Sequence, residues 1–517
     1  MRVIDFFDNG VGLYPDNIAF SEGDMRLTYA QAAAQTHKIA CAIRAKGYGK
    51  GTKIAILAPN SNVAFVALLS VFRAEGIWLP VNARNPVEVN VDLLARFDAD
   101  LLLYHSTYEN DAVIIAKAVP GIHDIVCIDN KSSKKANLSD WTSSADELFS
   151  SGLEIPDDIM AIFPTGGTTG KSKGVMISHR NIEAMFANFF AHLNYHDGTH
   201  HLVVAPMTHS AGLLGCLHFP RGGTNHIMSK VDPEEIMKAI ESDGITHLFL
   251  PPTVLYMMLA HANVGKYDYS SLAHFMVGAA PSSFEKLKQA IGIFGPVMTE
   301  AFGQAEAPAS IAMKAPWDYI DKKGVIIDSR LLSCGRPAVF NSVAIMDDDG
   351  TIMPKGSAGE IVVKGPLVTP GYYKNPEETA KVRGFGWHHT GDIGVMDAEG
   401  FISIVDRKKD MIITGGFNVF PNEIEQVLAA HAAVQECAVV GVPDEKWGEA
   451  VKAIVLLKPN SVATETELIA LAKAKLGGVK APKSVDFVDD LPRSPNGKVL
   501  KTELRKAYWH NAARAVN

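Results

Sequence analysis

The chain has 517 residues, of which 47% are hydrophobic and 21% are charged, and its formal net charge is −8 at pH 7. This length predicts more than one folding unit, at roughly 100–200 residues per domain. The composition excludes a disordered, collagenous or coiled-coil chain, and the acidic balance argues against a general nucleic-acid binder. Small anionic ligands remain compatible with it, because they need only local positive charge.

The cysteines and the apolar segments indicate the compartment. Five cysteines, at positions 41, 127, 216, 334 and 437, lie far apart and form no CxxC pair, so they predict neither a zinc site nor a disulfide framework. The N-terminal MRVIDFFDNG lacks the basic and then apolar pattern of a signal segment, and the longest apolar stretches are too short to span a bilayer. We expect a cytoplasmic protein without an integral membrane segment, either a monomer or a homodimer.

Short hydrophobic runs alternate with amphipathic stretches through the first half of the chain, which predicts α/β layers with largely parallel sheets. From about Ser342, strand-like segments follow one another with short Gly and Asp turns and indicate a smaller β-rich subdomain. The expected strands are Lys53–Leu57, Gly76–Val81, Asp100–Tyr104, His123–Ile128, His201–Ala205, Thr246–Leu250, Ala273–Val277, Ser342–Met346, Gly359–Val363 and Phe401–Val405, and Thr28–Lys46 and Ser61–Glu75 are expected helices.

The last stretch, from Arg407, has a pattern of its own that predicts an α+β domain of roughly 110 residues. We therefore expect a large α/β N-terminal domain over residues 1–406, built from two layered αβ subdomains and the β-rich subdomain, and a small α+β domain over 407–517. The DRKKD segment at Asp406–Asp410 is the expected hinge. The elements expected in the small domain are helices Pro421–His431 and Thr464–Leu476 and strands Cys437–Val442, Val451–Leu457 and Val485–Phe487.

The strongest local signal is FPTGGTTGKSKGV at Phe163–Val175, which follows a hydrophobic strand. Within it, Thr165–Lys173 contains three glycines, three threonines and two lysines. Glycines allow the backbone to approach an anion, hydroxyls and amides donate hydrogen bonds, and lysines add charge, so a triphosphate is the natural ligand and a surface turn the alternative. The spacing does not fit the P-loop pattern GxxxxGK[ST], because Thr165 stands where the first glycine is required.

Further segments accompany this loop along the chain. They are APMTHSAG (Ala205–Gly212), VGAAP (Val277–Pro281), FGQAE (Phe302–Glu306), WHHTGDIG (Trp387–Gly394), ITGGFNVFP, GVPDEKWGE (Gly441–Glu449) and LPRSPNGKVLK (Leu491–Lys501). In their order and spacing they resemble the motifs of the adenylate-forming enzymes, specifically the AMP-forming acyl-CoA synthetases. The sequence departs from the family pattern at Gly166 (usually Ser), Ser172 (usually Pro), Phe302 (usually Tyr) and Ala305 (usually Thr).

The resemblance implies an adenylation site that uses ATP and Mg²⁺. Glu306 would hold the metal against the phosphates, since Mg²⁺ takes one or two carboxylates plus phosphate oxygens. Lys498 and His209 would complete the catalytic set with Glu306. The residues implied to bind ATP or AMP are Thr165, Gly166, Gly167, Thr168, Thr169, Gly170, Lys171, Lys173, Gly278, Ala279, Ala280, Glu300, Phe302, Gly303, Asp392 and Arg407, and those implied to line the acyl pocket are His209, Ser210, Gly212, Val277, Gly278 and Gly303.

The resemblance further implies a second half-reaction, in which the thiol of CoA attacks the acyl-adenylate. The small domain would be mobile and swing about Lys409, and Gly415, Gly416 and Trp447 would line the passage for pantetheine. The expected substrate is a medium-sized acyl, aryl or alicyclic carboxylate. Two alternatives stay open: a ligase that loads a separate carrier protein, and a non-catalytic nucleotide-binding protein.

Overall fold

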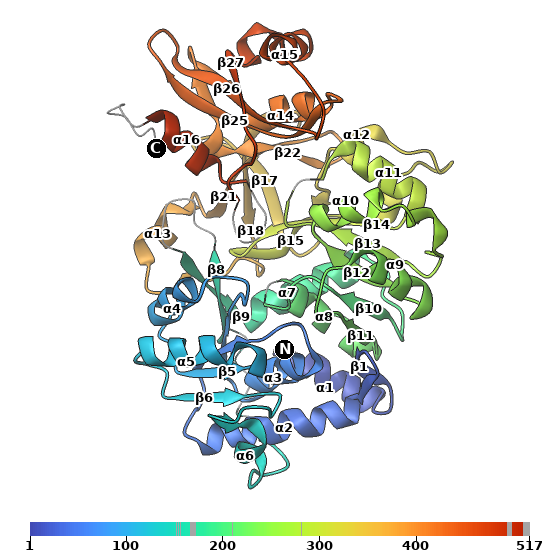
Figure 1. The fold of residues 1–517 in the computed structure, drawn as a ribbon, viewed down its shortest axis with the longest axis vertical. Helices are drawn as coiled ribbons and strands as arrows, with labels where there is room; N and C mark the ends of the chain where they lie inside the picture. Colours follow the sequence, from blue (N-terminus) through green and yellow to red (C-terminus); the bar gives the residue numbers. More distant parts are fainter. Residues whose placement is uncertain are drawn as a thin grey trace. The chain divides into compact units, whose positions relative to one another are not determined.

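The computed structural model describes residues 1–150, 152, 155, 157–165, 172–208, 210–280, 282–493 and 499–509. These residues form two compact units, and most of their helices and strands are labelled in Figure 1. The first unit takes Met1–Thr165, Lys171–Ser342 and Val363–Gly386, and the second takes Val343–Val362 and Trp387–Asn517, in each case as far as the described residues reach. Within the described ranges, no helix has both the length and the apolar character needed to cross a bilayer.

The first unit contains an eight-stranded sheet in the order β19-β9-β8-β4-β3-β5-β6-β7. Strands β3 to β8 pair in parallel, whereas β9 runs antiparallel to both β8 and β19. Helices α4 and α5 cover one face through Leu93, Leu94 and Ile115. The strands are β3 (Lys53–Leu57), β4 (Ile77–Pro80), β5 (Leu101–Tyr104), β6 (Asp124–Cys127), β7 (Ala136–Asn137), β8 (Ile159–Thr165), β9 (Lys173–Ser178) and β19 (Gly371–Tyr372), and the helices are α1 (Val3–Leu13), α2 (Tyr29–Ala45), α3 (Asn62–Arg73), α4 (Val87–Arg96), α5 (Glu109–Ala118), α6 (Leu138–Thr142) and α7 (His179–His192).

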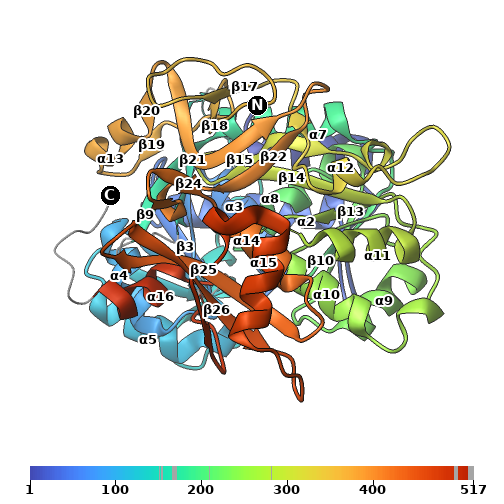
Figure 2. The same cartoon turned by 90° about the horizontal axis from the view of Figure 1, so that it is seen from above.

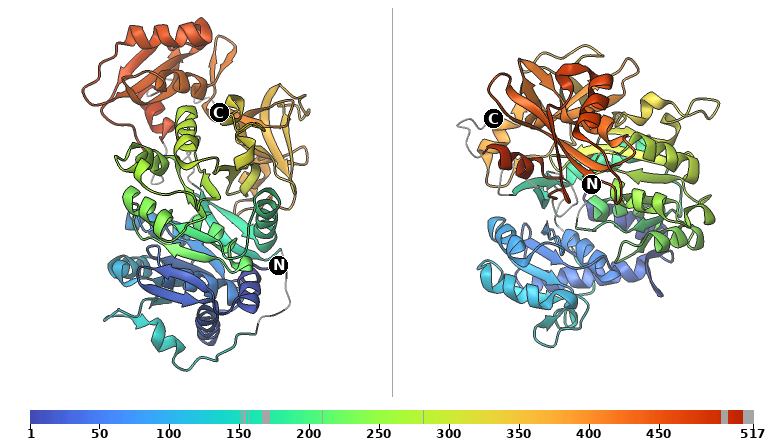
Figure 3. Two further views of the ribbon diagram at one scale, coloured as in Figure 1. Left: turned by 90° about the vertical axis from the view of Figure 1, so that its right-hand side faces the viewer. Right: turned by 45° about the horizontal axis from the view of Figure 1, so that its top comes forward.

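A nine-stranded sheet forms the second layer of this unit, in the order β16-β15-β14-β13-β12-β10-β11-β1-β2. Figure 3 shows the blue-to-cyan and green segments of the unit as adjacent αβ layers. Helix α9 illustrates how local sequence sets an element, because Pro233 occupies its first position and Asp232 caps the backbone amides of Glu234 and Glu235 at 2.9 and 3.2 Å. The strands are β1 (Ile18–Glu22), β2 (Met25–Thr28), β10 (His200–Val203), β11 (Thr224–Ile227), β12 (His247–Leu250), β13 (His274–Val277), β14 (Met298–Gln304), β15 (Ala307–Lys314) and β16 (Arg336–Pro337), and the helices are α8 (Ser210–Cys216), α9 (Pro233–Ser242), α10 (Pro252–Ala260), α11 (Phe284–Phe294) and α12 (Asp328–Leu331). Helix α13 (Pro376–Lys381) lies against β19 of the eight-stranded sheet.

A buried group of imidazoles lies at the amino ends of the central strands of this sheet. His201, His247 and His274 are neighbours across β10, β12 and β13, and His218 stacks on His201 with ring centroids 4.4 Å apart. We call these four side chains the histidine layer. Burial lowers the pKa of His201 and of His274 to about 4, and it lowers the pKa of His218 and of His247 still further. The histidine layer is therefore uncharged at neutral pH.

The second unit combines two sheets. In one, β17 pairs with β18, β18 with β21, and β21 with β22. In the other, the order is β24-β23-β26-β25, and β27 pairs with β26. The strands are β17 (Ser342–Met346), β18 (Ala358–Lys364), β21 (Trp387–Met396), β22 (Ile402–Arg407), β23 (Ile412–Thr414), β24 (Phe417–Val419), β25 (Val434–Asp444), β26 (Gly448–Leu457) and β27 (Ser484–Phe487), the helices are α14 (Pro421–Ala429), α15 (Glu465–Lys480) and α16 (Lys501–Trp509), and the short strand β20 (Arg383–Gly384) precedes β21 in the chain.

Alternating side chains of β25 and β26 bury both faces of the C-terminal sheet. Val439 and Ala453 pack with helices α14 and α15, whereas Val440 and Ile454 pack with Leu504 of α16. Figure 2 shows α14 and α15 lying over the β25–β26 hairpin. The predicted fold class, a large α/β part followed by a small α+β domain, is confirmed. The domain boundary at 406/407 and the hinge stay predictions.

Candidate functional site

The hairpin of β8 and β9 presents the predicted phosphate loop. Thr165 and Lys173 face each other as its last register pair, and the Thr165 hydroxyl donates to the Lys173 carbonyl at 3.3 Å. The two strands thus deliver two of the predicted nucleotide ligands to one spot. The remaining predicted loop ligands, Gly166, Gly167, Thr168, Thr169, Gly170 and Lys171, lie outside the described residues.

Lys173 is held by groups from a distant segment. Its ammonium pairs with the Glu378 carboxylate of α13 and lies 5.0 Å from the centroid of the Tyr372 ring. Glu378 also receives Lys381 at 2.5 Å, and its hydrogen bonds to Lys173 and Lys381 lower the pKa of that carboxyl to about 2. The carboxylate therefore stays ionised and fixes the loop lysine at neutral pH.

Glu306, the predicted metal ligand, occupies the tight connection between β14 and β15. The Tyr372 hydroxyl donates to its Oε1 at 2.6 Å, and its backbone carbonyl accepts the Thr369 amide at 2.9 Å. Burial and the neighbouring Glu306 charge raise the pKa of Tyr372, so this hydroxyl remains a donor. Burial lowers the pKa of the nearby Arg383, whose guanidinium is attracted to the Glu306 carboxylate. One polar group thus joins Glu306 to the lysine of the phosphate loop.

Three of these residues, Tyr372, Glu378 and Arg383, were not predicted from the sequence. Tyr372 and Glu378 belong to the segment GYYKNPEET at Gly371–Thr379, whose concentration of aromatic, acidic and turn residues between two strands was the available signal. Their partners are remote in the chain, because Tyr372 contacts a residue 66 positions away and Glu378 one 205 positions away.

Residues predicted to bind the acyl group and the adenine lie at the carboxyl end of β13, beside β14. Val277 pairs with Glu300, and Ala279 follows with a backbone φ of +70°, a left-handed conformation uncommon for a non-glycine residue. Gly303 is required by packing, because a Cβ there would lie 2.4 Å from the Ala309 amide nitrogen. Gly278, Ala280, Phe302, Ser210 and Gly212 are placed in the same layer, in or directly after β13, β14 and α8, while His209 lies outside the described residues.

Glu300 takes part in a buried ion pair. Its Oε2 accepts the Tyr319 hydroxyl at 2.7 Å and lies 2.5 Å from the Lys314 ammonium, whose side chain is 0% exposed. Lys314 also donates to the carbonyls of Arg330 and Ser333 at 2.7 and 2.5 Å. This arrangement gives Glu300 a structural role, and its predicted contact with the nucleotide stays a prediction.

In the second unit, the predicted ribose ligands lie side by side. Asp392 of β21 and Arg407 of β22 are register partners, and the Arg407 Nε lies 2.6 Å from the Asp392 Oδ1. Asp392 is buried, whereas the Arg407 side chain is 38% exposed. An anchored carboxylate beside a partly exposed guanidinium suits recognition of a diol together with an anion.

The predicted hinge, Lys409, lies in the short 3-10 helix Lys408–Asp410 between β22 and β23. Arg505 of α16 donates to the Lys409 carbonyl at 3.3 Å, and Asn422 donates its amide to Asp406 at 2.7 Å. Burial raises the pKa of Asp406. These contacts tie the segment to the C-terminal helices, and motion about Lys409 stays a prediction.

The predicted CoA residues meet at one turn. Gly415 and Gly416 form the β23–β24 hairpin turn with φ values of +57° and +83°, which L side chains rarely adopt. Gly415 donates its amide to the Trp447 carbonyl at 2.8 Å, and a Cβ on Gly415 would lie 2.6 Å from the indole ring. Trp447 is 43% exposed and carries the Lys446 ammonium 4.6 Å from its ring. Lys498 lies outside the described residues.

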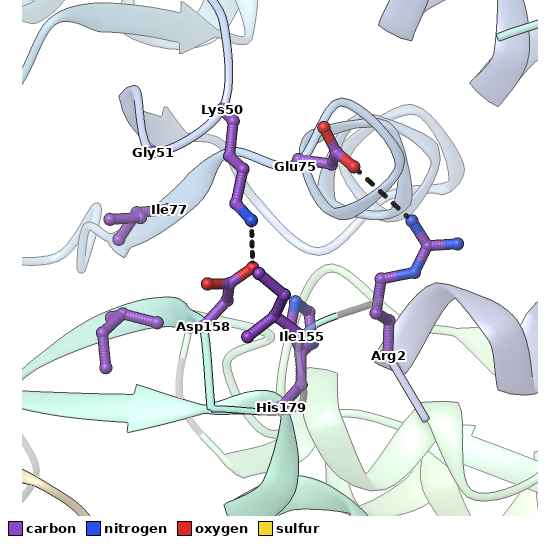
Figure 4. Close-up of a pocket in the computed structure, with 9 residues that line it drawn as sticks. Arg2, Lys50, Gly51, Glu75, Ile77, Ile155, Asp158 and His179 are labelled. Carbon is purple, nitrogen blue, oxygen red and sulfur yellow. Dashed lines mark ion pairs between the residues drawn. The ribbon is translucent and has the colours of Figure 1, made fainter. Parts of the chain in front are cut away.

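Figure 4 shows a cavity of about 220 Å³ elsewhere in the first unit, near the N-terminus and the start of α7. Lys50 pairs with Asp158 there, Arg2 lies 3.9 Å from Glu75, and burial lowers the pKa of His179 to about 4. None of the predicted site residues within the described ranges lines it. Because its cations already face carboxylates, we do not assign this cavity to the substrate.

Comparison with known proteins agrees with this arrangement. The family description "AMP-binding enzyme" matches residues 7–373, and "AMP-binding enzyme C-terminal domain" matches residues 423–498. The chain belongs to the AMP-binding enzyme family. The predicted membership of the adenylate-forming superfamily is therefore confirmed.

Individual members of the AMP-binding family are similar over long ranges. The chain is 41% identical over 368 residues to the medium/long-chain-fatty-acid–CoA ligase FadD8 of Mycobacterium tuberculosis, a match that spans 70% of this chain and 63% of that protein. It is 32% identical over 503 residues to feruloyl-CoA synthase of Amycolatopsis sp, which covers 96% of each chain. The crystal structure of ATP-bound MatB from Rhodopseudomonas palustris is similar with a TM-score of 0.88 and 28% sequence identity, over 99% of each chain.

Proposed function

We propose that this protein is an AMP-forming carboxylate–CoA ligase that works through an acyl-adenylate. The observation that carries the proposal is the convergence of Lys173 and Glu306 on Tyr372 at the loop end of the β8–β9 hairpin. A cation and a carboxylate held beside a glycine- and threonine-rich loop suit a nucleotide triphosphate. Family membership and the names of the relatives agree with this function.

In the first half-reaction, a carboxylate oxygen of the acid attacks the α-phosphorus of ATP, and the bond to pyrophosphate breaks. Negative charge grows on the phosphoryl oxygens, so catalysis rests on positioning and charge stabilisation. Lys173 and the loop amides bind the phosphates, Lys498 is assigned to the reacting phosphoryl group, and Asp392 and Arg407 are assigned to the ribose. His209 is assigned to the carboxylate that is activated.

Glu306 fits the metal that this reaction uses. Across the described ranges, no group of three or more His, Cys, Asp and Glu side chains could hold a metal ion. Mg²⁺ sites on nucleotides commonly have one or two protein carboxylates, with phosphate oxygens and water as the other ligands. When bound, Mg²⁺ supplies positive charge that holds the phosphates and offsets the charge of the transition state. The hydrogen bond to Oε1 leaves Glu306 further lone pairs for such a cation.

In the second half-reaction, the CoA thiol attacks the acyl carbonyl and AMP leaves. We assign the passage of pantetheine to the Gly415–Gly416 turn and Trp447, because backbone without a Cβ leaves room for a narrow chain. The GVPDEKWGE segment, which contains Trp447, favours CoA over a carrier protein as the acceptor. The acid is proposed to be a medium-sized acyl, aryl or alicyclic carboxylate, and the fatty-acid and feruloyl ligases among the relatives support that range.

A panel of a few dozen carboxylic acids tests the proposal. We expect carboxylate-dependent ATP–pyrophosphate exchange, and release of AMP when CoA is added. If no acid supports exchange, the proposal is wrong and the protein is a non-catalytic nucleotide-binding protein. AMP release with holo-carrier proteins but not with CoA would instead identify a carrier-loading ligase. Lys498→Ala separates the two steps, since it should abolish exchange and spare CoA transfer from supplied acyl-adenylate.

A further inference from the structure

Tyr372 connects two groups to which the proposed function gives separate tasks. Its hydroxyl donates to the Glu306 carboxylate at 2.6 Å, and its ring lies 5.0 Å from the Lys173 ammonium. The side chain is 6% exposed, so the hydrogen bond is made away from bulk water. A hydrogen bond to a charged group is stronger there than a bond between neutral groups.

The backbone fixes the position of this tyrosine. Strand β19 pairs antiparallel with β9, so that Tyr372 faces Val175, two residues from Lys173. The Tyr372 amide donates to the Thr379 hydroxyl at 2.9 Å. At Gly371 a Cβ would lie 2.4 Å from the Thr379 side chain, which holds helix α13 tightly against this strand. The hydroxyl is therefore presented to Glu306 by a constrained main chain.

We propose that Tyr372 is a positioning residue that orients the Glu306 carboxylate for the metal–nucleotide complex. By occupying Oε1, the hydroxyl limits rotation of the carboxylate and directs its remaining lone pairs toward a cation. Partners that hold a metal-binding side chain in this way typically change metal affinity or activity by about tenfold or more when they are removed. This inference rests on the proposed function, because it takes Glu306 as the metal ligand.

The neighbouring tyrosine offers a matched control. The Tyr373 hydroxyl donates to the Asp98 Oδ2 at 2.7 Å, and the Lys374 ammonium lies 5.5 Å from the Tyr373 ring. Tyr373 therefore repeats the same kind of contacts, a carboxylate on the hydroxyl and a cation near the ring, away from the predicted site. Tyr372→Phe and Tyr373→Phe each remove one hydroxyl and keep the aromatic ring.

The experiment measures binding of the ATP analogue with an α,β-methylene bridge by calorimetry, once with Mn²⁺ and once with EDTA. For Tyr372→Phe we expect the affinity with Mn²⁺ to fall about tenfold, the affinity in EDTA to stay within about twofold, and the KM for the acid to be unchanged. For Tyr373→Phe we expect wild-type values in every measurement. Wild-type binding by Tyr372→Phe with Mn²⁺, or an equal loss with and without metal, would overturn the inference.

A double variant separates positioning from folding. In a Glu306→Gln background, Tyr372→Phe should have little further effect on Mn²⁺–analogue affinity, because the oxygen that it positions no longer carries the charge. The double variant also allows the test if Tyr372→Phe alone does not fold. With Glu306 replaced as well, no carboxylate has lost its hydrogen-bond donor. A further tenfold loss in the double variant would contradict the inference. Failure of the proposed function itself would be distinct, because the wild type would then show no carboxylate-dependent exchange.

Discussion

The two ends of the strands in the nine-stranded sheet hold ionisable side chains in different ways. At the amino ends, His201, His247 and His274 are buried, and burial keeps them uncharged. Beside the carboxyl end of β13, Glu300 is also largely enclosed, but the buried Lys314 compensates its charge at 2.5 Å. The contrast shows two ways in which this sheet buries an ionisable side chain: the three imidazoles are uncharged, whereas the carboxylate of Glu300 is paired with a buried cation.

The largest effect is expected from acidification, which should lower the free energy of unfolding because the buried histidines must then be protonated. The folded protein holds the pKa of His201 and of His274 at about 4, below the ordinary value of 6.5. The unfolded state therefore binds more protons between these two values, so stability rises with pH across this window and is lost as pH falls from 6.5 toward 4. Each of the two histidines contributes a loss of about 3 kcal/mol at the acid end.

Urea unfolding at a series of pH values measures this loss. Neighbouring imidazoles add to it, since His196 opposes protonation of both His247 and His274. His123→Gln is the control, because His123 is exposed and its replacement should leave the pH dependence unchanged. A free energy of unfolding that stays flat between pH 6.5 and 4 would show that the histidine layer is protonated without cost in the folded state.

Removal of the buried lysine should come next in size. Lys314→Met leaves Glu300 without its cation, and breaking a buried pair from one side typically destabilises a protein by about 3–5 kcal/mol. Glu300→Gln in the same chain should restore part of that loss. Lys374→Met is the control, because Lys374 is 63% exposed in its pair with Asp98 and should change stability by less than about 1 kcal/mol. Urea unfolding at neutral pH measures both variants. Equal losses of unfolding free energy in Lys314→Met and Lys374→Met would show that the buried ion pair is no more important than the exposed one.

At the predicted metal ligand, the expected effect is on rate. Glu306→Gln keeps the shape of the side chain and removes its charge, so ATP–pyrophosphate exchange should fall about 10²- to 10³-fold, with a melting temperature close to that of the wild type. Glu377→Gln changes an exposed glutamate of α13 and should leave exchange unaffected. Retention of more than a third of the exchange rate in Glu306→Gln would exclude Glu306 as the metal ligand.

The smallest effect is expected within the histidine layer at neutral pH. The His247 Nε2 is buried and has no hydrogen-bond partner in the described part of the chain, while its Nδ1 lies 2.8 Å from the Thr246 hydroxyl. That hydroxyl also bonds the main chain of His200, so it stays satisfied without the imidazole. His247→Leu should therefore change stability by less than about 1 kcal/mol at neutral pH and reduce the acid sensitivity. A large loss at neutral pH would assign His247 a packing role that Leu cannot supply.

Local patterns predicted the elements well. Strands β3 and β17 occupy the expected residues Lys53–Leu57 and Ser342–Met346, and helix α2 lies one residue inside the expected range at each end. Helix α15 begins one residue after the expected start at Thr464, and Thr464 caps it, with Glu467 donating its amide to the Thr464 hydroxyl at 3.2 Å. These features depend on periodicity and on short-range hydrogen bonds, both of which are readable from a single sequence.

Contacts across the sheets could not be predicted in the same way. The motifs located Glu306 and Lys173, but Tyr372 joins them only because β19 pairs with β9. The histidine layer likewise arises from the strand order β10-β12-β13, which places residues of three separate strands next to each other. Strand order depends on the packing of the whole sheet, and no local pattern in the chain encodes it.

The consecutive residues Tyr372 and Tyr373 also limit the insertions and deletions that the chain can tolerate at this point. Tyr372 reaches Glu306 beside the nine-stranded sheet, and Tyr373 reaches Asp98, which precedes a strand of the eight-stranded sheet. Neighbouring residues of an extended chain point to opposite sides, so inserting or deleting one residue here would turn each ring away from its carboxylate. Evolutionary or engineered length variation should therefore be rare in this short connection, even though Tyr373→Phe, which keeps the ring in place, should be harmless.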